Sequence, residues 1–190
     1  MAIIIFDFDD TLFDTKRFNN DVIERFVVYG VDEGLARQAY HDTKIQTGNY
    51  NLADHINIIQ NLNNTEIPKD FHDWFESLDL TSYVLPQSTE MLNNLAQDHT
   101  LLLLSKGKDD FQNLKINRSN LAKHFNEIHI TPDEKEIFLT DKIFNDKVIF
   151  INDKENENNK ISIEYPHFQI VHRHENIKAE DILNIIKSSM

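Results

Sequence analysis

The sequence predicts an α/β fold in which a parallel sheet lies between two layers of helices. Short apolar runs recur along the chain, most of them end in polar or acidic residues, and stretches with helical spacing separate them. Strands that alternate with helices form parallel sheets, and in open α/β sheets ligands bind at the carboxyl ends of the strands. The pattern therefore predicts both a fold class and the sheet edge at which a functional site is expected.

The first apolar run, residues 3–6, passes directly into Asp7 and Asp9. A short run rich in β-branched residues is typical of a strand buried on both faces of a parallel sheet. Both acids then leave the end of that strand into one crevice. Because two carboxylates at close range repel each other, we expect a cation between them, and oxygen ligands favour a hard metal ion.

Residues 14–81 show helical spacing throughout. Apolar residues recur three or four positions apart in four stretches, and the breaks between them fall at Gly30, Gly48 and Pro68. Asp32 is expected to cap the second helix. The aromatic residues on these helices are interpreted as packing within a helical unit rather than as a cofactor site. Four side chains of this unit could reach a ligand but receive no role: Lys16, Arg17, His41 and His55.

Strand and helix patterns alternate again from Ser82 onward. Four further strands and a closing helix are expected at residues 101–104, 128–130, 148–151, 168–171 and 177–186. The polar stretch 153–160, rich in Asn and Glu, is predicted to be a loop. Residues 1–13 and 82–190 are expected to form one α/β core domain, with residues 14–81 inserted after its first strand as an all-helical domain.

The composition is that of a globular chain without disulfides. Of 190 residues, 40% are hydrophobic and 27% are charged, and there is no cysteine. No apolar run is long enough for a membrane span, and the first strand begins too near Met1 for a targeting peptide, so we expect a cytoplasmic protein. The net charge of −13 argues against nucleic-acid and anionic-membrane partners, which require basic surfaces. A small phosphorylated ligand needs only a local electropositive pocket.

Polar residues follow three of the expected strands, at Asp7 and Asp9, at Ser105 and at Asp153. The carboxyl ends of parallel strands converge, so these side chains are expected around one crevice. A carboxylate can attack phosphorus and form an aspartyl phosphate. The charge on the phosphoryl oxygens must then be neutralised by a metal ion, a cationic side chain and hydrogen-bond donors. The constellation therefore suits phosphoryl transfer.

The stretch IIIFDFDDTL, residues 3–12, resembles the first motif of the haloacid dehalogenase (HAD) superfamily, hhhhDxDxT. Ser105, Lys135 and Asp153 follow in the order of that superfamily's later motifs, and residues 14–81 lie where it has a helical cap. The resemblance implies a three-layer Rossmann-like core with an all-helical cap. It also implies a Mg²⁺-dependent hydrolase that acts on a small-molecule phosphate monoester.

The same resemblance implies a role for each matching residue. Asp7 would be the nucleophile, and Asp9 would be the general acid and base that protonates the leaving oxygen and later activates water. The phosphoryl group would be held by Ser105 with the backbone amides after it, Lys106 and Lys135. The magnesium ligands would be Asp7, Asp9 with its backbone carbonyl, Asp153 and Glu157.

Three of the residues assigned to the phosphate and metal sites could instead have a purely structural role. Ser105 could cap the helix that follows it. Lys135 could lie on a solvated helix face, with Lys142 and Lys147 competing as the phosphate cation. Asp153 could be a loop carboxylate that binds no metal.

The fourth motif departs from the superfamily pattern. Asn152 stands where a Gly is usual, and Glu157 and Asn158 occupy the two places where a second acid is expected. Glu157 could complete the metal shell, act through water or lie on a solvated loop.

The altered fourth motif supports an alternative function, a non-catalytic HAD-like module that binds phosphate or another protein. Intact Asp7, Asp9, Thr11 and Ser105 argue against it, because a binding role does not require them. A phosphomutase would keep the same two acids. Asp9 separates the phosphatase and mutase alternatives from the superfamily's dehalogenases, which do not need an acid to protonate a leaving alkoxide.

Overall fold

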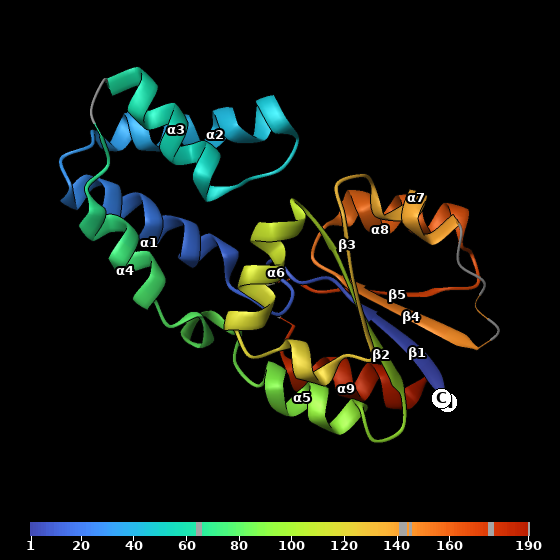
Figure 1. Cartoon of the computed structure of the whole chain (residues 1–190). Helices are drawn as coiled ribbons and strands as arrows, with labels where there is room; N and C mark the ends of the chain where they lie inside the picture. The colour runs from blue at the N-terminus through green and yellow to red at the C-terminus, as the bar shows by residue number, and fades with distance from the viewer. Residues whose placement is uncertain (64–65, 141–143, 145, 175–176, 190) are drawn as a thin grey trace.

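A five-stranded parallel sheet forms the centre of the α/β part of the chain in a computed structural model, which describes residues 1–63, 66–140, 144, 146–174 and 177–189 (Figure 1). The strands are β1 (Ala2–Phe6), β2 (Thr100–Lys106), β3 (Glu127–Thr131), β4 (Lys147–Asn152) and β5 (Gln169–His172). They lie in the order β3-β2-β1-β4-β5, and every neighbouring pair is parallel. The predicted α/β fold class is confirmed, and each strand begins and ends within two residues of its expected bounds.

Strand β1 is central because both of its faces are apolar. Ile4 and Phe6 point into one buried cluster and Ile5 points into the other, as the alternation of side chains along a strand requires. Phe6 pairs with Leu103 of β2 on one side and with Ile151 of β4 on the other. The residues that follow β1, β2 and β4 therefore emerge at one edge of the sheet.

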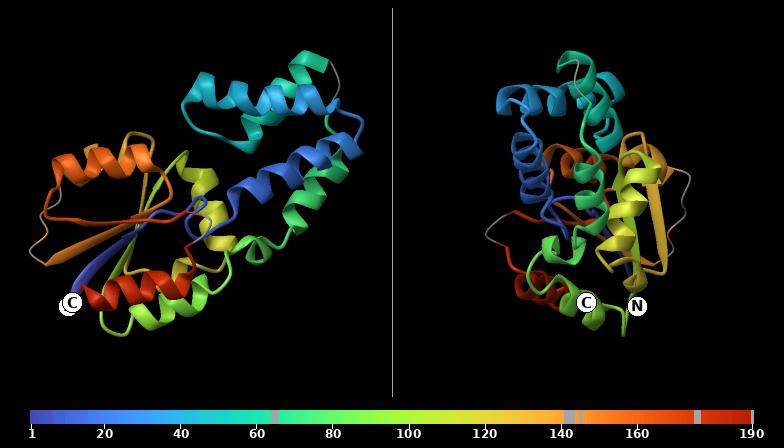
Figure 2. Two further views of the ribbon diagram at one scale, coloured as in Figure 1. Left: turned by 180° about the vertical axis from the view of Figure 1, so that it is seen from behind. Right: turned by 60° about the vertical axis from the view of Figure 1, so that its left-hand side comes forward.

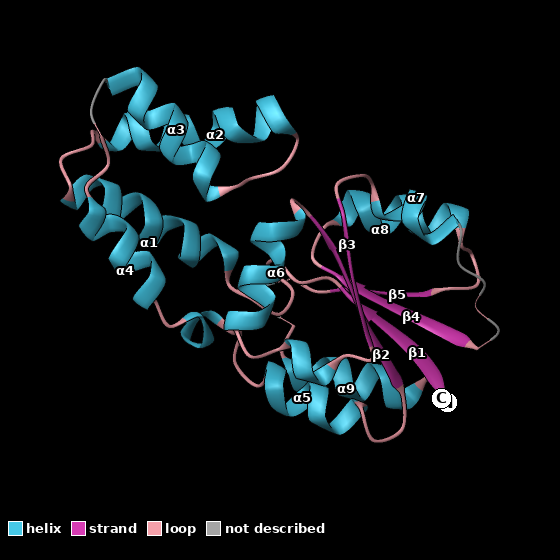
Figure 3. Ribbon diagram, in the orientation of Figure 1, coloured by secondary structure: helices cyan, strands magenta, loops and turns pink. Residues whose placement is uncertain are grey.

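Helices cover both faces of the sheet, as Figures 1 and 3 show. One face is covered by α5 (Ser88–Leu95), α6 (Asp109–Arg118) and α9 (Ala179–Ser188), whose buried apolar residues belong to the same cluster as Phe6. The other face is covered by α7 (Lys135–Thr140) and α8 (Glu155–Glu164). This gives the three layers that the alternating pattern predicts.

The prediction of a loop at residues 153–160 is wrong, because most of this stretch lies in α8. The helix buries Glu157, Asn158 and Ile161, which lie on one side of it at helical spacing. Two of these three residues are polar, so hydrophobic periodicity gives no signal for the helix. Their burial depends on partners in α7 and β4, which only the folded chain supplies.

Four helices between β1 and α5 form a separate group beside the sheet (Figure 2). They are α1 (Thr15–Val28), α2 (Glu33–Thr47), α3 (Leu52–Asn63) and α4 (Lys69–Ser77). The Asp32 side chain caps α2 by accepting from the Leu35 amide, and Gly48 ends it with a left-handed backbone. The stacked rings of Phe26 and Phe71, 4.4 Å apart, join α1 to α4 inside the group. Its division from the core at residues 13 and 82 stays a prediction.

The two connections between this helical unit and the core run side by side. Phe13 forms an antiparallel bridge with Val84, the Asp14 amide donates to the Tyr83 carbonyl at 2.8 Å, and the Leu85 amide donates to the Leu12 carbonyl at 2.9 Å. The short 3-10 helix η1 (Leu80–Tyr83) leads into the returning connection. In the described part of the chain, no helix is long and apolar enough to cross a membrane.

His55 is a buried polar side chain that joins α2 to α3. Its Nε2 lies 2.8 Å from the Ala36 carbonyl, which can only accept, so Nε2 carries the proton and Nδ1 accepts from the Tyr50 hydroxyl at 3.1 Å. The ring is fully buried and also contacts Phe26. Burial lowers the pKa of His55 to about 4, although the bond to the Ala36 carbonyl opposes this shift.

We predict that acid destabilises the protein through His55. Its pKa is lower in the folded state than in the unfolded state, so the unfolded chain takes up the proton first as pH falls below about 6.5. Stability should decline from there to about pH 4, by roughly 3 kcal/mol in total. Urea unfolding of wild type and His55→Gln across this range measures the difference, with His72→Gln, which removes an exposed histidine of α4, as the control. A wild-type decline that persists in full in His55→Gln would contradict the assignment.

Candidate active site

The Lys135 side chain lies at the centre of the candidate site. It projects from the first turn of α7 and is completely buried. Its Nζ lies 2.7 Å from Asp7 Oδ1, 3.0 Å from Glu157 Oε2 and 3.1 Å from Asn152 Oδ1. The alternative of a lysine on a solvated helix face is therefore wrong, and a buried ammonium with this set of partners is fully paired.

The two competing lysines do not supply this cation in the described structure. Lys147 begins β4, at the opposite edge of the sheet, and donates to the Ser189 carbonyl. Lys142 lies outside the described residues.

Asp7 and Asp153 each have a buried oxygen with no hydrogen-bond partner among the described residues, Oδ2 in Asp7 and Oδ1 in Asp153. Burial and then the nearby charge of Asp7 raise the pKa of Asp153 to about 7. His172 Nε2 donates to the Asp153 carbonyl at 2.8 Å and holds this part of the chain in place. Two buried carboxylates that each leave an oxygen unpaired, one of them with a raised pKa, fit a divalent cation between them.

The metal ligands expected from the sequence are not all assembled. Glu157 turns both of its oxygens to lysines, with Oε2 at 3.0 Å from Lys135 and Oε1 at 3.3 Å from Lys154. Burial favours its neutral form, but these two lysines outweigh burial and lower the pKa of Glu157. Within the described part of the chain, no group of three or more His, Asp or Glu side chains is arranged to hold a metal. Backbone oxygens and water would therefore complete any magnesium shell, as is common for this ion.

Ser105 lies at the carboxyl end of β2, where it is completely buried and its hydroxyl has no partner among the described residues. It does not cap the next helix, because α6 begins at Asp109 with Lys108 in the cap position. Of the backbone amides after Ser105, that of Gly107 donates to the Thr131 carbonyl at 2.9 Å. The Lys106 ammonium is paired with Glu134 on the cavity wall. The Ser105 hydroxyl thus has an unused hydrogen-bonding capacity at this strand end.

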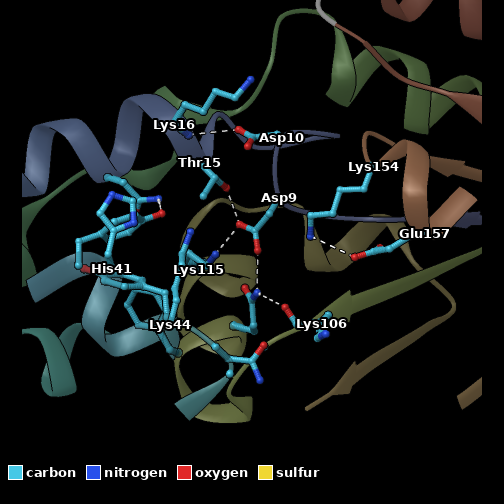
Figure 4. A pocket seen from close by; sticks show the side chains of 18 of the residues that line it. Asp9, Asp10, Thr15, Lys16, His41, Lys44, Lys106, Lys115, Lys154 and Glu157 are labelled. Atoms are coloured by element: carbon cyan, nitrogen blue, oxygen red, sulfur yellow. Dashed lines mark hydrogen bonds and ion pairs between the residues drawn. The ribbon is translucent and has the colours of Figure 1, made fainter. Parts of the chain in front are cut away.

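The Asp9 carboxylate is held by three side chains from two helices (Figure 4). Thr15 of α1 and Lys115 of α6 contact Oδ1, and Gln112 Nε2 of α6 donates to Oδ2 at 2.7 Å. Burial alone would raise the pKa of Asp9, but the Lys115 charge and the donated hydrogen bonds lower it to about 2. Asp9 is therefore ionised and turned toward α6.

Sequence reasoning missed Gln112, Lys115 and Lys154. Gln112 and Lys115 lie three residues apart on the buried side of α6, and Lys115 is enclosed by the rings of Phe8 and Phe111, each 5.4 Å from its Nζ. The signal in the sequence was that these two polar residues share a helix face with apolar ones, which indicates that their side chains point into the protein. Lys154 directly follows Asp153 and lines the same cavity as Asp9.

A cavity of about 780 Å³ separates the helical unit from the carboxyl edge of the sheet. The core wall carries Asp9, Lys106 and Lys115, and the opposite wall is formed by α1, α2 and the segment around Tyr50. Of the predicted site residues, Asp9, Lys106 and Glu157 line this cavity. Asp7, Ser105 and Lys135 are buried and do not line it, and neither does Asp153. The arrangement combines a buried carboxylate, a paired ammonium, a free hydroxyl and a space for a ligand.

The family model described as haloacid dehalogenase-like hydrolase matches residues 4–159 of the chain. A search of curated proteins found no match. Among solved structures, a candidate haloacid dehalogenase-like hydrolase from Burkholderia xenovorans LB400 is 16% identical, with a TM-score of 0.77 over 96% of this chain and 90% of that chain.

Two further solved structures have the same fold. A candidate β-phosphoglucomutase from Thermotoga maritima is 18% identical, with a TM-score of 0.67 over 100% of each chain. YfnB from Bacillus subtilis, a candidate HAD-hydrolase in a magnesium-bound form, is 14% identical, with a TM-score of 0.64 over 97% of this chain and 98% of that chain. At such low identities the likeness shows the shared fold.

We predict that any side chain at position 107 destabilises the protein, because it would clash with the side chain of Gln112. The backbone of Gly107 is not left-handed, but a Cβ atom there would lie 2.6 Å from both Cγ and Nε2 of the buried Gln112. Gly107→Ala should therefore destabilise the protein by about 1–3 kcal/mol, as overpacking does. The same change in a Gln112→Ala background should cost less than about 0.5 kcal/mol. Urea unfolding of the four proteins in this cycle measures both values, and equal costs in the two backgrounds would exclude the clash as the cause.

Proposed function

Because the chain belongs to the haloacid dehalogenase-like hydrolases, we propose that it is a Mg²⁺-dependent phosphatase that hydrolyses a small phosphate monoester through an aspartyl phosphate on Asp7. The observation that carries the proposal is how the two carboxylate oxygens of Asp7 are hydrogen-bonded. This buried carboxylate has one oxygen held by Lys135 at 2.7 Å, and its other oxygen has no partner in the described structure. A nucleophile needs such a fixed orientation together with an electron pair that no hydrogen bond occupies.

In the first half-reaction, an Asp7 oxygen attacks phosphorus and the bond from phosphorus to the leaving alkoxide oxygen breaks. Negative charge on the phosphoryl oxygens is neutralised by the Lys135 ammonium and by a hydrogen bond from the Ser105 hydroxyl. In the second half-reaction, water attacks the phosphorus of the aspartyl phosphate. Inorganic phosphate leaves and the Asp7 carboxylate is restored.

Asp9 supplies and removes protons in this scheme. A carboxyl group protonates a leaving alkoxide only from its own protonated form, and contact with Lys115 keeps Asp9 ionised. The acid step therefore requires the Asp9–Lys115 contact to open when substrate enters. After the alkoxide has taken the proton, the ionised Asp9 removes a proton from the attacking water.

A magnesium ion would be held by Asp7, Asp153 and the Asp9 backbone carbonyl, with Glu157 as a direct or water-mediated ligand. The two unpaired buried oxygens of Asp7 and Asp153 support this assignment. When bound, the metal supplies positive charge that offsets the repulsion between these carboxylates and the phosphoryl group.

The substrate proposed is a small molecule in the cytoplasm. The net charge of −13 disfavours nucleic acid and anionic membranes as partners. A non-catalytic module would not require Lys135 to be buried against Asp7, which argues against that alternative. A phosphomutase shares the first half-reaction and differs in returning the phosphoryl group to a sugar instead of to water.

We predict that the protein releases inorganic phosphate from an aryl phosphate with Mg²⁺ and not with EDTA. Asp7→Asn should lower kcat by roughly a thousandfold or more, because the amide cannot form the phosphoenzyme. Phosphate release and phenolate absorbance measure the reaction, and circular dichroism controls for folding of the variant.

If wild type shows no metal-dependent release of phosphate, and Asp7→Asn has the same rate as wild type, the proposed phosphatase function is wrong. Release of halide from a 2-haloacid by wild type, with no phosphate released, would favour a dehalogenase instead. Transfer of phosphate to an added sugar phosphate faster than to water would favour the mutase.

We further predict that Glu157→Gln raises the Mg²⁺ concentration that gives half-maximal activity, because the variant removes one negative charge from the metal's surroundings. Glu155→Gln changes the same charge on an exposed residue of the same helix and serves as the control. Metal titrations of the three proteins measure the effect. Superimposable titration curves for wild type and Glu157→Gln would remove Glu157 from the metal shell.

A further inference from the structure

Helix α2 presents basic side chains to the cavity. Arg37, His41 and Lys44 line it together with Tyr40, whereas the two acids of this helix, Glu33 and Asp42, do not. In a chain with a net charge of −13, a helix that turns its basic residues but not its acids toward a cavity provides a local positive wall.

Lys44 has the least compensated charge of this wall. Its Nζ lies 4.3 Å from the centre of the Tyr40 ring, and no carboxylate pairs with it among the described residues. Arg37, in contrast, forms an ion pair with Glu33 at 2.9 Å. The lysines that the core wall contributes are also neutralised, because Lys106, Lys115 and Lys154 each meet a carboxylate.

Tyr40 fixes the position of this cation. Its hydroxyl accepts from Asn19 Nδ2 at 3.0 Å, and its ring packs against Tyr50 with centroids 4.9 Å apart. The same ring packs edge-on against the His41 ring, with centroids 5.6 Å apart. Tyr40 therefore contacts both Lys44 and His41 and keeps them close together. In the view of Figure 4, Lys44 and His41 lie on one side of Asp9, and Lys154 and Glu157 lie on the other.

The cavity is much larger than a phosphoryl group. Its volume of about 780 Å³ lies within the range of sites that enclose a whole metabolite. If the phosphoryl group lies against Asp7, Lys135 and Ser105, the leaving group extends toward α2. It then reaches the basic side chains of α2, of which Lys44 has no carboxylate partner among the described residues.

We propose that the substrate is a phosphate monoester whose leaving group carries a second anionic group, a carboxylate or a phosphate, and that Lys44 and His41 bind this group. The proposal rests on the proposed phosphatase function and adds the class of substrate to it. Lys44 is a specificity residue that contacts the distal anion, and Tyr40 is the positioning residue beneath it.

Three phosphate esters with the same three-carbon chain test the proposal, one ending in a methyl group, one in a carboxylate and one in a second phosphate. Wild type should have a kcat/KM about tenfold or more higher for one or both anionic esters than for the methyl ester. The preferred anionic ester identifies the distal group as carboxylate or phosphate. Equal kcat/KM values for all three esters would overturn the proposal.

Lys44→Gln should remove this preference by raising KM for the anionic esters about tenfold, with kcat and the methyl ester unchanged. Lys69→Gln is the matched control, because it removes one lysine charge from α4 of the same helical unit, where Lys69 pairs with Asp73 and lies outside the cavity. A loss in Lys44→Gln that is equal for all three esters, or one that Lys69→Gln reproduces, would overturn the role of Lys44.

Calorimetric binding of the three esters to Asp7→Asn separates this proposal from the proposed function. Tighter binding of an anionic ester that Lys44→Gln abolishes in the Asp7→Asn background supports the anion site, even if wild type hydrolyses none of the esters. Turnover of aryl phosphate by wild type, together with equal binding of all three esters, would retain the phosphatase and overturn the anion site.

Discussion

The buried ammonium of Lys135 is the constraint on which the site depends. A charge removed from water must be paired, and here its partners are Asp7 at the end of β1, Asn152 at the end of β4 and Glu157 in α8. These partners come from three separate segments of the chain. The ammonium has all of its partners only when β1 and β4 pair in the register that brings their ends together. The fold of the core therefore fixes the position of Asp7, the candidate nucleophile.

The second acid of the first motif is held differently. Asp7 is buried and has its partner, Lys135, in the core. Asp9 lies at the junction between the core and the helical unit and is contacted by Thr15 of α1. Lys115 and Gln112 complete its contacts from α6. Movement at this junction would change the surroundings of Asp9 and leave those of Asp7 intact, as the proposed acid–base role of Asp9 would require.

The electrostatics of the cavity divide between its two walls. On the core wall, acids and lysines neutralise one another, so a bound phosphoryl group must compete for the existing cations or bring in a metal ion. On the α2 wall, Lys44 lines the ligand space, and no carboxylate among the described residues pairs with it. In the proposed phosphatase, the core wall would serve the chemistry of the phosphoryl group, and the opposite wall would recognise the rest of the substrate.

The α/β class, the strands and the polar residues at their ends could be predicted from the sequence, because an apolar run and the residue that ends it are local features. Asp7, Ser105 and Asp153 were found in this way. The tertiary structure alone decided that 155–164 is a helix and that Lys115 pairs with Asp9, 106 residues away. These outcomes depend on burial of polar groups by distant partners, for which local periodicity carries no signal.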